Sequence, residues 1–206
     1  MAIKLKNVRS NQSLVGKSHW WGAPDLPKEV PYPCVKVQDK DGDYMEPLTF
    51  ICQIRCRDIA SLDSEGILPH TGMLYFFAPI NYFLGEHDTP IDYHESPVVV
   101  YSEQEDNLTP YELHWEGTTE SVFATAEGMS FEHISGHETD GHAMLSIPYM
   151  DEIQSTYPDH IALLQIDEED DWNLRFYDCG MYFIMIERNA LANREWGKAV
   201  GALYYS

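Results

Sequence analysis

Three histidines and three acidic residues gather between residues 131 and 142, and these side chains are the best suited in the sequence to hold a metal ion. They are His133, His137, His142, Glu132, Glu138 and Asp140. Imidazole and carboxylate groups bind zinc in many hydrolases. The spacing of His133 and His137 would suit one face of a helix, but Gly136 lies between them and the HExxH order is absent. A metal-dependent hydrolase is therefore one hypothesis, and a solvated polar loop, which we favour, is the other.

An apolar run near the start of the chain recurs in similar form near its end. The two runs are residues 48–54 and 161–166, and each has a glutamine just before its last isoleucine. Each is followed, after a polar break, by a second apolar run that opens on Gly-Met. Nearly continuous apolar runs of this length are typical of buried strands. We therefore predict one domain made of two structural repeats, about residues 18–80 and 142–200, joined by a β-rich acidic connection.

Gln53 and Gln165, the glutamines of these runs, are candidate ligand-binding residues. A pseudo-two-fold axis between the repeats would bring them close together, at a cleft between the two halves. Trp20, Trp21 and Asp178 would join them there, because pockets combine aromatic walls with a few polar groups. The alternative is structural. Each glutamine would then satisfy backbone groups at a strand end or bridge the two halves, and the tryptophan pair would fill the edge of the core.

The remaining pattern predicts an α+β fold, with mostly antiparallel sheets, a few short helices and a C-terminal helix. The runs 73–78 and 97–101 are rich in aromatic or β-branched residues and predict strands. Helices are predicted over residues 120–129, 149–157 and 189–200. Gly128 lies near the end of the first, and Gly201 directly follows the last.

Acidic residues dominate the charge of the chain. It has 34 acidic and 13 basic residues, which gives a formal net charge of −21. Such a chain repels nucleic-acid phosphates and anionic lipids, so we predict neither a nucleic-acid nor a membrane-surface role. The same charge favours a basic protein partner, although solubility alone would also explain it.

The sequence lacks the marks of secretion, membrane insertion or cofactor binding. No N-terminal segment resembles a signal peptide, and no apolar run approaches the roughly 20 residues that cross a bilayer. The four cysteines (Cys34, Cys52, Cys56 and Cys179) form no CxxC pair and indicate reduced thiols. We found no phosphate-binding loop, dinucleotide fingerprint or GxSxG motif, so we predict no cofactor. A cytoplasmic protein is expected, and the oligomeric state is not predicted.

Several motifs, taken together and in order, resemble the YwqG-like bacterial proteins, a family of unknown function. They are Gly22-Ala23-Pro24-Asp25-Leu26-Pro27, Pro47-Leu48-Thr49-Phe50-Ile51-Cys52-Gln53-Ile54, Leu68-Pro69-His70-Thr71-Gly72-Met73-Leu74-Tyr75-Phe76-Phe77, Leu163-Leu164-Gln165-Ile166 and Asp178-Cys179-Gly180-Met181-Tyr182-Phe183-Ile184. The resemblance implies an α+β fold with internal duplication, and it brings no activity, cofactor or catalytic residue. Relatives thought to occur near polymorphic-toxin genes imply a toxin-neutralising role.

Three functions are compatible with these observations. The first is a non-catalytic, immunity-like protein-binding module, whose negative charge would steer a basic toxin toward it. The second is a small-molecule-binding protein with a cleft between the repeats, lined by the glutamines, tryptophans and aspartate named above. The third is the metal-dependent hydrolase.

Overall fold

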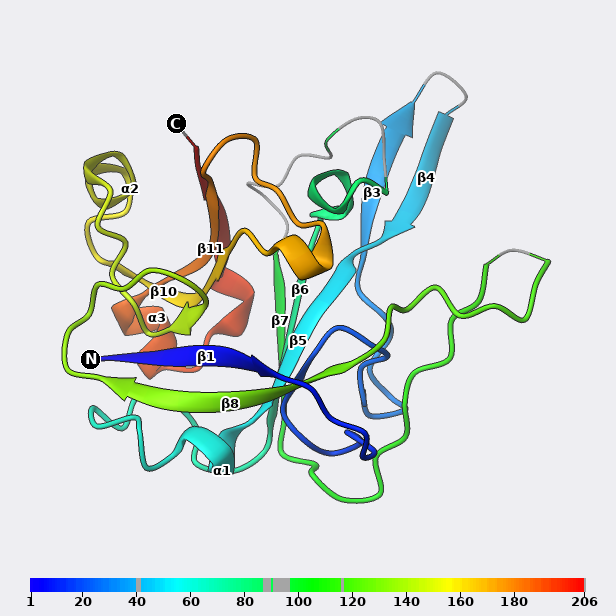
Figure 1. Cartoon of the computed structure of the whole chain (residues 1–206), viewed down its shortest axis with the longest axis horizontal. Coiled ribbons are helices and arrows are strands. Elements are labelled where there is room, and N and C mark those ends of the chain that lie inside the picture. The colour runs from blue at the N-terminus through cyan, green and yellow to red at the C-terminus, as the bar shows by residue number, and fades with distance from the viewer. Residues whose placement is uncertain (40–41, 87–89, 91–96, 116, 206) are drawn as a thin grey trace.

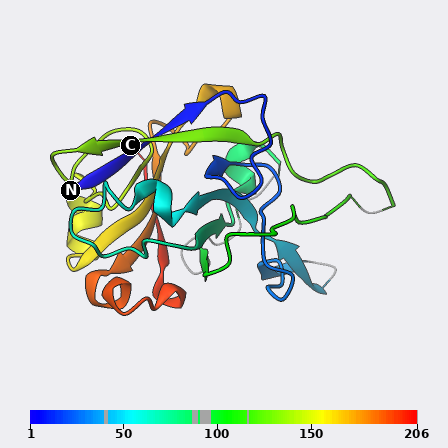
Figure 2. The ribbon, with the colours of Figure 1, turned by 90° about the horizontal axis from the view of Figure 1, so that it is seen from below.

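A curled sheet of ten strands dominates the part of the chain that the structure describes (Figure 1, Figure 2). The structure is a computed structural model and describes residues 1–39, 42–86, 90, 97–115 and 117–205. The strands are β1 (Ala2–Val8), β2 (His19–Trp20), β5 (Thr49–Arg55), β6 (Met73–Ala78), β7 (Val98–Ser102), β8 (Glu127–Ile134), β9 (Ala143–Met144), β10 (His160–Asp167), β11 (Met181–Glu187) and β12 (Val200–Tyr204). Their order is β12-β11-β10-β9-β1-β8-β2-β5-β6-β7, and all neighbours pair antiparallel.

The other elements are a hairpin and several short helices. The hairpin joins β3 (Cys34–Asp39) to β4 (Gly42–Pro47) and projects from the body of the molecule in Figure 1. The helices are α1 (Cys56–Ile59), α2 (Asp151–Thr156), α3 (Arg188–Ala192) and three single 3-10 turns, η1 (Asn81–Leu84), η2 (Asp170–Trp172) and η3 (Trp196–Lys198). Among the described residues, no helix has the length and apolar character needed to span a membrane.

The two halves of the sheet correspond strand by strand about the β1–β8 pair. In one half the short strand β2 pairs with β5, and in the other the short strand β9 pairs with β10. Gln53 of β5 lies opposite His19, and Gln165 of β10 lies opposite Ala143. Each long strand also has a register irregularity that ends one residue before its glutamine. The glutamines therefore occupy corresponding positions in the two halves.

Strand alternation divides the apolar residues between one shared core and two separate ones. On β6, Leu74 and Phe76 face the shared core, whereas Tyr75 faces a smaller cluster on the opposite side. On β11, Ile184 faces the shared core and Phe183 faces a third cluster. Because both halves contribute to one large cluster, the sheet must curl around it. The curl brings the ends of the sheet together, where the rings of Tyr101 on β7 and Trp196 on η3 lie 6.0 Å apart.

Gln53 connects the two loops that flank β2. Its Nε2 donates to the Lys17 carbonyl oxygen at 2.9 Å and to Asp25 Oδ2 at 2.6 Å. Its Oε1 accepts a hydrogen bond from the Asp25 backbone N–H at 2.9 Å. The side chain is fully buried, so these bonds replace water for every polar atom of the amide.

Gln165 does the same for the loops that flank β9. Its Nε2 donates to the carbonyl oxygens of Thr139 and Gly141, both at 2.8 Å. Its Oε1 accepts a hydrogen bond from the Ser146 hydroxyl at 2.7 Å. Lys17 and Gly141, which each accept a bond, both lie two residues before the strand residue opposite the glutamine. The same side-chain clasp therefore holds a two-residue strand in each half.

The prediction of an α+β fold with a C-terminal helix is wrong, because the structure is mostly β with only short helices. The predicted helix over 189–200 is limited to α3, after which Arg194 adopts a left-handed conformation with φ of 58°. Val200 then begins β12, which pairs with β11 and buries Ala202. The predicted helix over 120–129 is also wrong, since β8 begins at Glu127. In both places strand pairing overrides helix propensity.

Substitution of either glutamine tests the clasp. Gln53→Glu and Gln165→Glu keep the side-chain shape but remove the N–H donors and add a charge in a buried place. We expect each to lower the free energy of unfolding by about 3 kcal/mol, because carbonyl groups lose their partners. Urea denaturation measures this change. Gln38→Glu, on the exposed side of β3, is the matched control, and equal stability of all three variants would contradict the proposed role of the clasps.

Candidate functional site

A cleft of about 790 Å³ lies beside the hairpin. Its walls come from the end of β4, the start of β5, η1, η2, the turn after β2 and a loop that contributes residues 113–115 and 122–125. The hairpin and this loop project on the same side of the molecule (Figure 1, Figure 2). The aromatic side chains that line the cleft are Trp21, Tyr32, Phe50, Trp115, Phe123 and Trp172. Such a concave aromatic surface is suited to binding.

The charged residues of the cleft are acidic. Glu46, Glu86, Glu127 and Asp171 line it, and among its described lining residues there is no lysine or arginine. His114 is the only histidine among the described residues that line it. The cleft therefore attracts cations, and its indole and phenyl rings add cation–π attraction for a positive group that enters.

A sharp turn after β2 places Trp21 in the cleft wall. Trp21 and Gly22 both have left-handed backbones, with φ of 52° and 71°. A Cβ on Gly22 would lie 2.5 Å from the Cβ of Ala126, so only glycine allows this close approach. The Trp21 backbone N–H donates to the Ile51 carbonyl oxygen at 2.9 Å. The turn thus brings Trp21 beside the start of β8, where Glu127 stands.

The adjoining part of the wall is built by η2, which carries Asp171 and Trp172. Asn173 ends this turn in a left-handed conformation, and its side chain donates to the Leu84 carbonyl oxygen of η1 at 3.3 Å. The Trp172 ring meets the Trp21 ring edge-on, with centroids 5.0 Å apart. Trp21 belongs to the first half of the chain and Trp172 to the second, so the two halves meet at this end of the cleft.

Several polar atoms of the cleft walls have no hydrogen-bond partner among the described residues. They are Trp21 Nε1, Trp172 Nε1, Thr49 Oγ1 and Asn81 Oδ1. An unpaired buried polar atom costs about 1–3 kcal/mol. Native structures keep few such atoms, and these four belong to residues that line one cleft.

His142 supports Trp172 from behind. Its ring stacks on the Trp172 ring with centroids 4.9 Å apart and planes 18° apart, and it also contacts Trp20. His142 Nδ1 accepts a hydrogen bond from the Asp167 backbone N–H at 3.1 Å, so this nitrogen carries no proton. Burial, with a smaller contribution from the charge of Lys4, lowers the pKa of His142 to about 4.

The structure places His142 away from the other two histidines considered as metal ligands, both of which contact Met1. His133 contacts the Met1 sulfur at 3.2 Å, and His137 Nδ1 lies 2.8 Å from the Met1 amino group. His142 lies in the aromatic stack. Within the described ranges, no group of three or more histidine, cysteine or acidic side chains has the geometry to hold a metal ion. Instead of the expected loop alone, residues up to Ile134 belong to β8.

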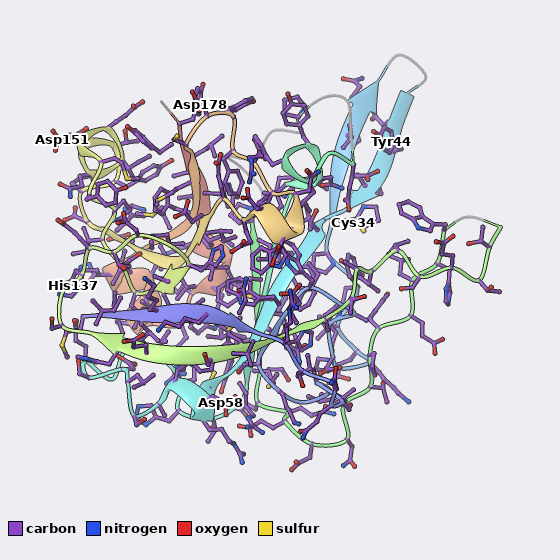
Figure 3. The ribbon with its side chains drawn as sticks, in the orientation of Figure 1. Cys34, Tyr44, Asp58, His137, Asp151 and Asp178 are labelled. Atoms are coloured by element: carbon purple, nitrogen blue, oxygen red, sulfur yellow. The ribbon has the colours of Figure 1, made fainter. Side chains whose placement is uncertain are left out.

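Of the five residues considered for ligand binding, Trp21 lines the cleft. Trp20 is fully buried behind it, in contact with Trp172. Gln53 and Gln165 are buried and bonded within their own halves, so the structure does not bring them together. Asp178 is exposed, in the loop that precedes β11 (Figure 3), and does not line the cleft.

Sequence reasoning missed most of the cleft, because its walls come from segments far apart in the chain. Asn81, Trp115 and Asp171 belong to three different connections and share no motif. The only sequence signal was the local one of aromatic residues beside acidic residues, as in the pairs Trp115-Glu116 and Asp171-Trp172. Glu116 itself lies outside the described residues.

Comparison with known families places the chain in one of them. Residues 18–156 match the model of DUF1963, described as a domain of unknown function. The chain belongs to this family. The matched DUF1963 segment begins at β2, includes the whole of the hairpin, β5–β9 and the loop of residues 113–125, and ends with α2. It therefore covers every wall of the cleft except η2. No curated protein matches the chain in sequence.

The buried state of His142 predicts a loss of stability in acid. Its pKa is 6.5 when unperturbed and about 4 in the folded protein, so the unfolded chain takes up the proton first as pH falls. The contribution of neutral His142 to the free energy of unfolding is complete above pH 6.5 and is lost as the pH falls toward 4. This difference corresponds to about 3 kcal/mol. Urea denaturation at pH 7 and pH 4 should show a larger decrease for the wild type than for His142→Gln.

His114→Gln is the control, because His114 is exposed. This variant should lose as much stability as the wild type between the two pH values. The interpretation fails if His142→Gln loses the same amount as well, since other acid-sensitive groups, including the buried His19, are common to all three proteins.

Proposed function

We propose that this member of DUF1963 is a non-catalytic binding protein whose cleft receives a basic segment of a protein partner. The observation that carries the proposal is the combination of four carboxylates, no lysine or arginine among the described lining residues, and six aromatic rings in one cleft. The net charge of −21 would steer a basic partner toward this site before contact.

The rim of the cleft supports a macromolecular partner. Trp115 is 57% exposed and Met45 is 60% exposed, and both line the cleft. Tyr44, beside Met45 on β4, is 40% exposed and points outward from the hairpin (Figure 3). Large exposed apolar side chains grouped at one site are typical of surfaces that bind proteins. They extend the contact beyond what the cleft alone provides.

A small cationic molecule is the second candidate for the same cleft. The volume of about 790 Å³ lies within the range of small-molecule sites, roughly 300–1,000 Å³. The unpaired polar atoms of Trp21, Thr49, Asn81 and Trp172 favour this candidate, because they would fix the orientation of a compact ligand. The metal-dependent hydrolase receives no support, since His142 lies away from His133 and His137 and no group of three potential metal ligands occurs among the described residues.

The toxin-neutralising role expected from the YwqG-like resemblance is a specific form of the first proposal. A basic toxin, neutralised in the cytoplasm by insertion of a basic segment into the cleft, would need no catalytic residue in this chain. Co-expression with a toxin encoded beside the gene would test this form, and growth without protection would contradict it. The more general proposal, binding of a basic segment, is tested with purified protein.

A fluorescent decapeptide of alternating basic and apolar residues is the probe. We expect it to bind the wild type, and to bind a Glu127→Gln, Asp171→Asn double variant at least about tenfold more weakly, because two carboxylates of the cleft are neutralised. Fluorescence anisotropy measures the affinity. Binding should also weaken as salt is raised, because ions screen the attraction.

The matched control is the Asp151→Asn, Glu152→Gln double variant, which makes the same change of charge on the exposed helix α2 (Figure 3). It should bind the peptide nearly as well as the wild type. Equal losses in both double variants would show that net charge alone attracts the peptide, and failure of the wild type to bind would refute the proposal.

A further inference from the structure

We infer that the end of the cleft lined by Trp21 and Trp172 is an arginine-binding subsite, which receives a guanidinium group in preference to an ammonium group. This inference rests on the proposed function and names the side chain by which the basic partner is recognised. It is carried by the chemistry of the groups at this end, namely two indole rings, two carboxylates and a buried amide oxygen.

The two carboxylates of the subsite come from different halves of the chain. Glu127 opens β8, and Asp171 lies on η2. Both line the cleft and also line a neighbouring hollow, together with Asn7 and Arg9, so they stand together at the boundary of the two depressions. A ligand cation at this boundary would be approached by carboxylates from separate walls.

The subsite has several hydrogen-bond acceptors on different walls, and a single ammonium group is poorly shaped to bond to all of them. Asn81 Oδ1 is buried on a lining residue and has no partner among the described residues, which adds an acceptor to the two carboxylates. Guanidinium offers five N–H donors in a plane and no acceptor. Ammonium offers three donors on a strongly hydrated point charge. Guanidinium can therefore donate to several acceptors on different walls of the cleft, because its N–H groups point in different directions within one plane.

The indole rings favour the same choice. Trp21 and Trp172 contact each other edge to face, at 89° and with centroids 5.0 Å apart, so a guanidinium group would pack beside this pair. A guanidinium plane stacks on an aromatic face and sheds its hydration more readily than an ammonium group does. A peptide that carries this arginine also has carbonyl oxygens, which are acceptors suited to the unpaired indole N–H groups.

The protein's own Arg9 bears on the subsite from the neighbouring hollow. It shares Glu127 and Asp171 with the cleft, and no ion pair joins it to either residue within the described part of the chain. Arg9 therefore adds positive potential at the place where the ligand cation would sit. Its removal should strengthen binding of an arginine peptide.

The test compares the decapeptide synthesised with arginine at every basic position and with lysine at every basic position. Both carry the same charge, so net electrostatic attraction is equal. We expect the arginine peptide to bind the wild type at least about fivefold more tightly, by fluorescence anisotropy. A citrulline version, which keeps the planar shape without the charge, should lose binding. Arg9→Gln should increase affinity for the arginine peptide about twofold to fivefold.

Two variants locate the preference. Asp171→Asn is on an exposed position and Trp172→Phe keeps an aromatic ring, so both should fold, as circular dichroism would check. Each should reduce the arginine-to-lysine ratio of affinities, whereas Trp196→Phe should not, because Trp196 packs against Tyr101 and does not line the cleft. A ratio near one in the wild type, or a ratio unchanged in the two variants, would overturn the inference. If neither charged peptide binds, the proposed function fails with it.

Discussion

The fold depends on a side-chain hydrogen-bond clasp that occurs twice. β2 and β9 have only two residues each, too few to hold their places by backbone pairing alone. In each half, a buried glutamine bonds to the loops on both sides of the short strand. The amide is well suited to this role, because it donates and accepts at once and carries no charge into the core. The short strands in turn connect the centre of the sheet to its outer strands.

The clasps also position the walls of the cleft. The clasp of Gln53 fixes the loop of residues 17–25, which contains Trp21. The clasp of Gln165 fixes the segment of residues 139–146, which contains His142, the support on which Trp172 stacks. The candidate binding surface is therefore held from both halves. The corresponding strands serve the architecture, and the connections, which differ between the halves, supply the aromatic and acidic groups.

Strands that are buried on both faces were predictable from sequence, because such strands are continuously apolar. The runs 48–54 and 161–166 predicted β5 and β10, and the run 73–78 predicted β6. The prediction of a helix over 189–200 was wrong. The alanines and the tryptophan have helical spacing, but this spacing does not reveal the left-handed backbone of Arg194 or the pairing of β12 with β11 at the edge of the sheet. The cleft was not predictable, because Asn81, Glu127 and Asp171 meet only through sheet curvature. Gln53 and Gln165 occupy equivalent positions in sequence but remain apart, because four strands lie between β5 and β10 in the sheet.

The tryptophan indole N–H signals provide the most direct test of the claim that a basic segment enters the cleft. The chain has five tryptophans, and an amide-type two-dimensional NMR spectrum of 15N-labelled protein shows one indole signal for each. On titration with the arginine decapeptide, we predict that the signals of Trp21, Trp115 and Trp172 move, while that of Trp196, which packs against Tyr101 away from the cleft, stays in place. Movement confined to Trp196, or no movement at all under saturating peptide, would contradict the assignment of this cleft as the binding site.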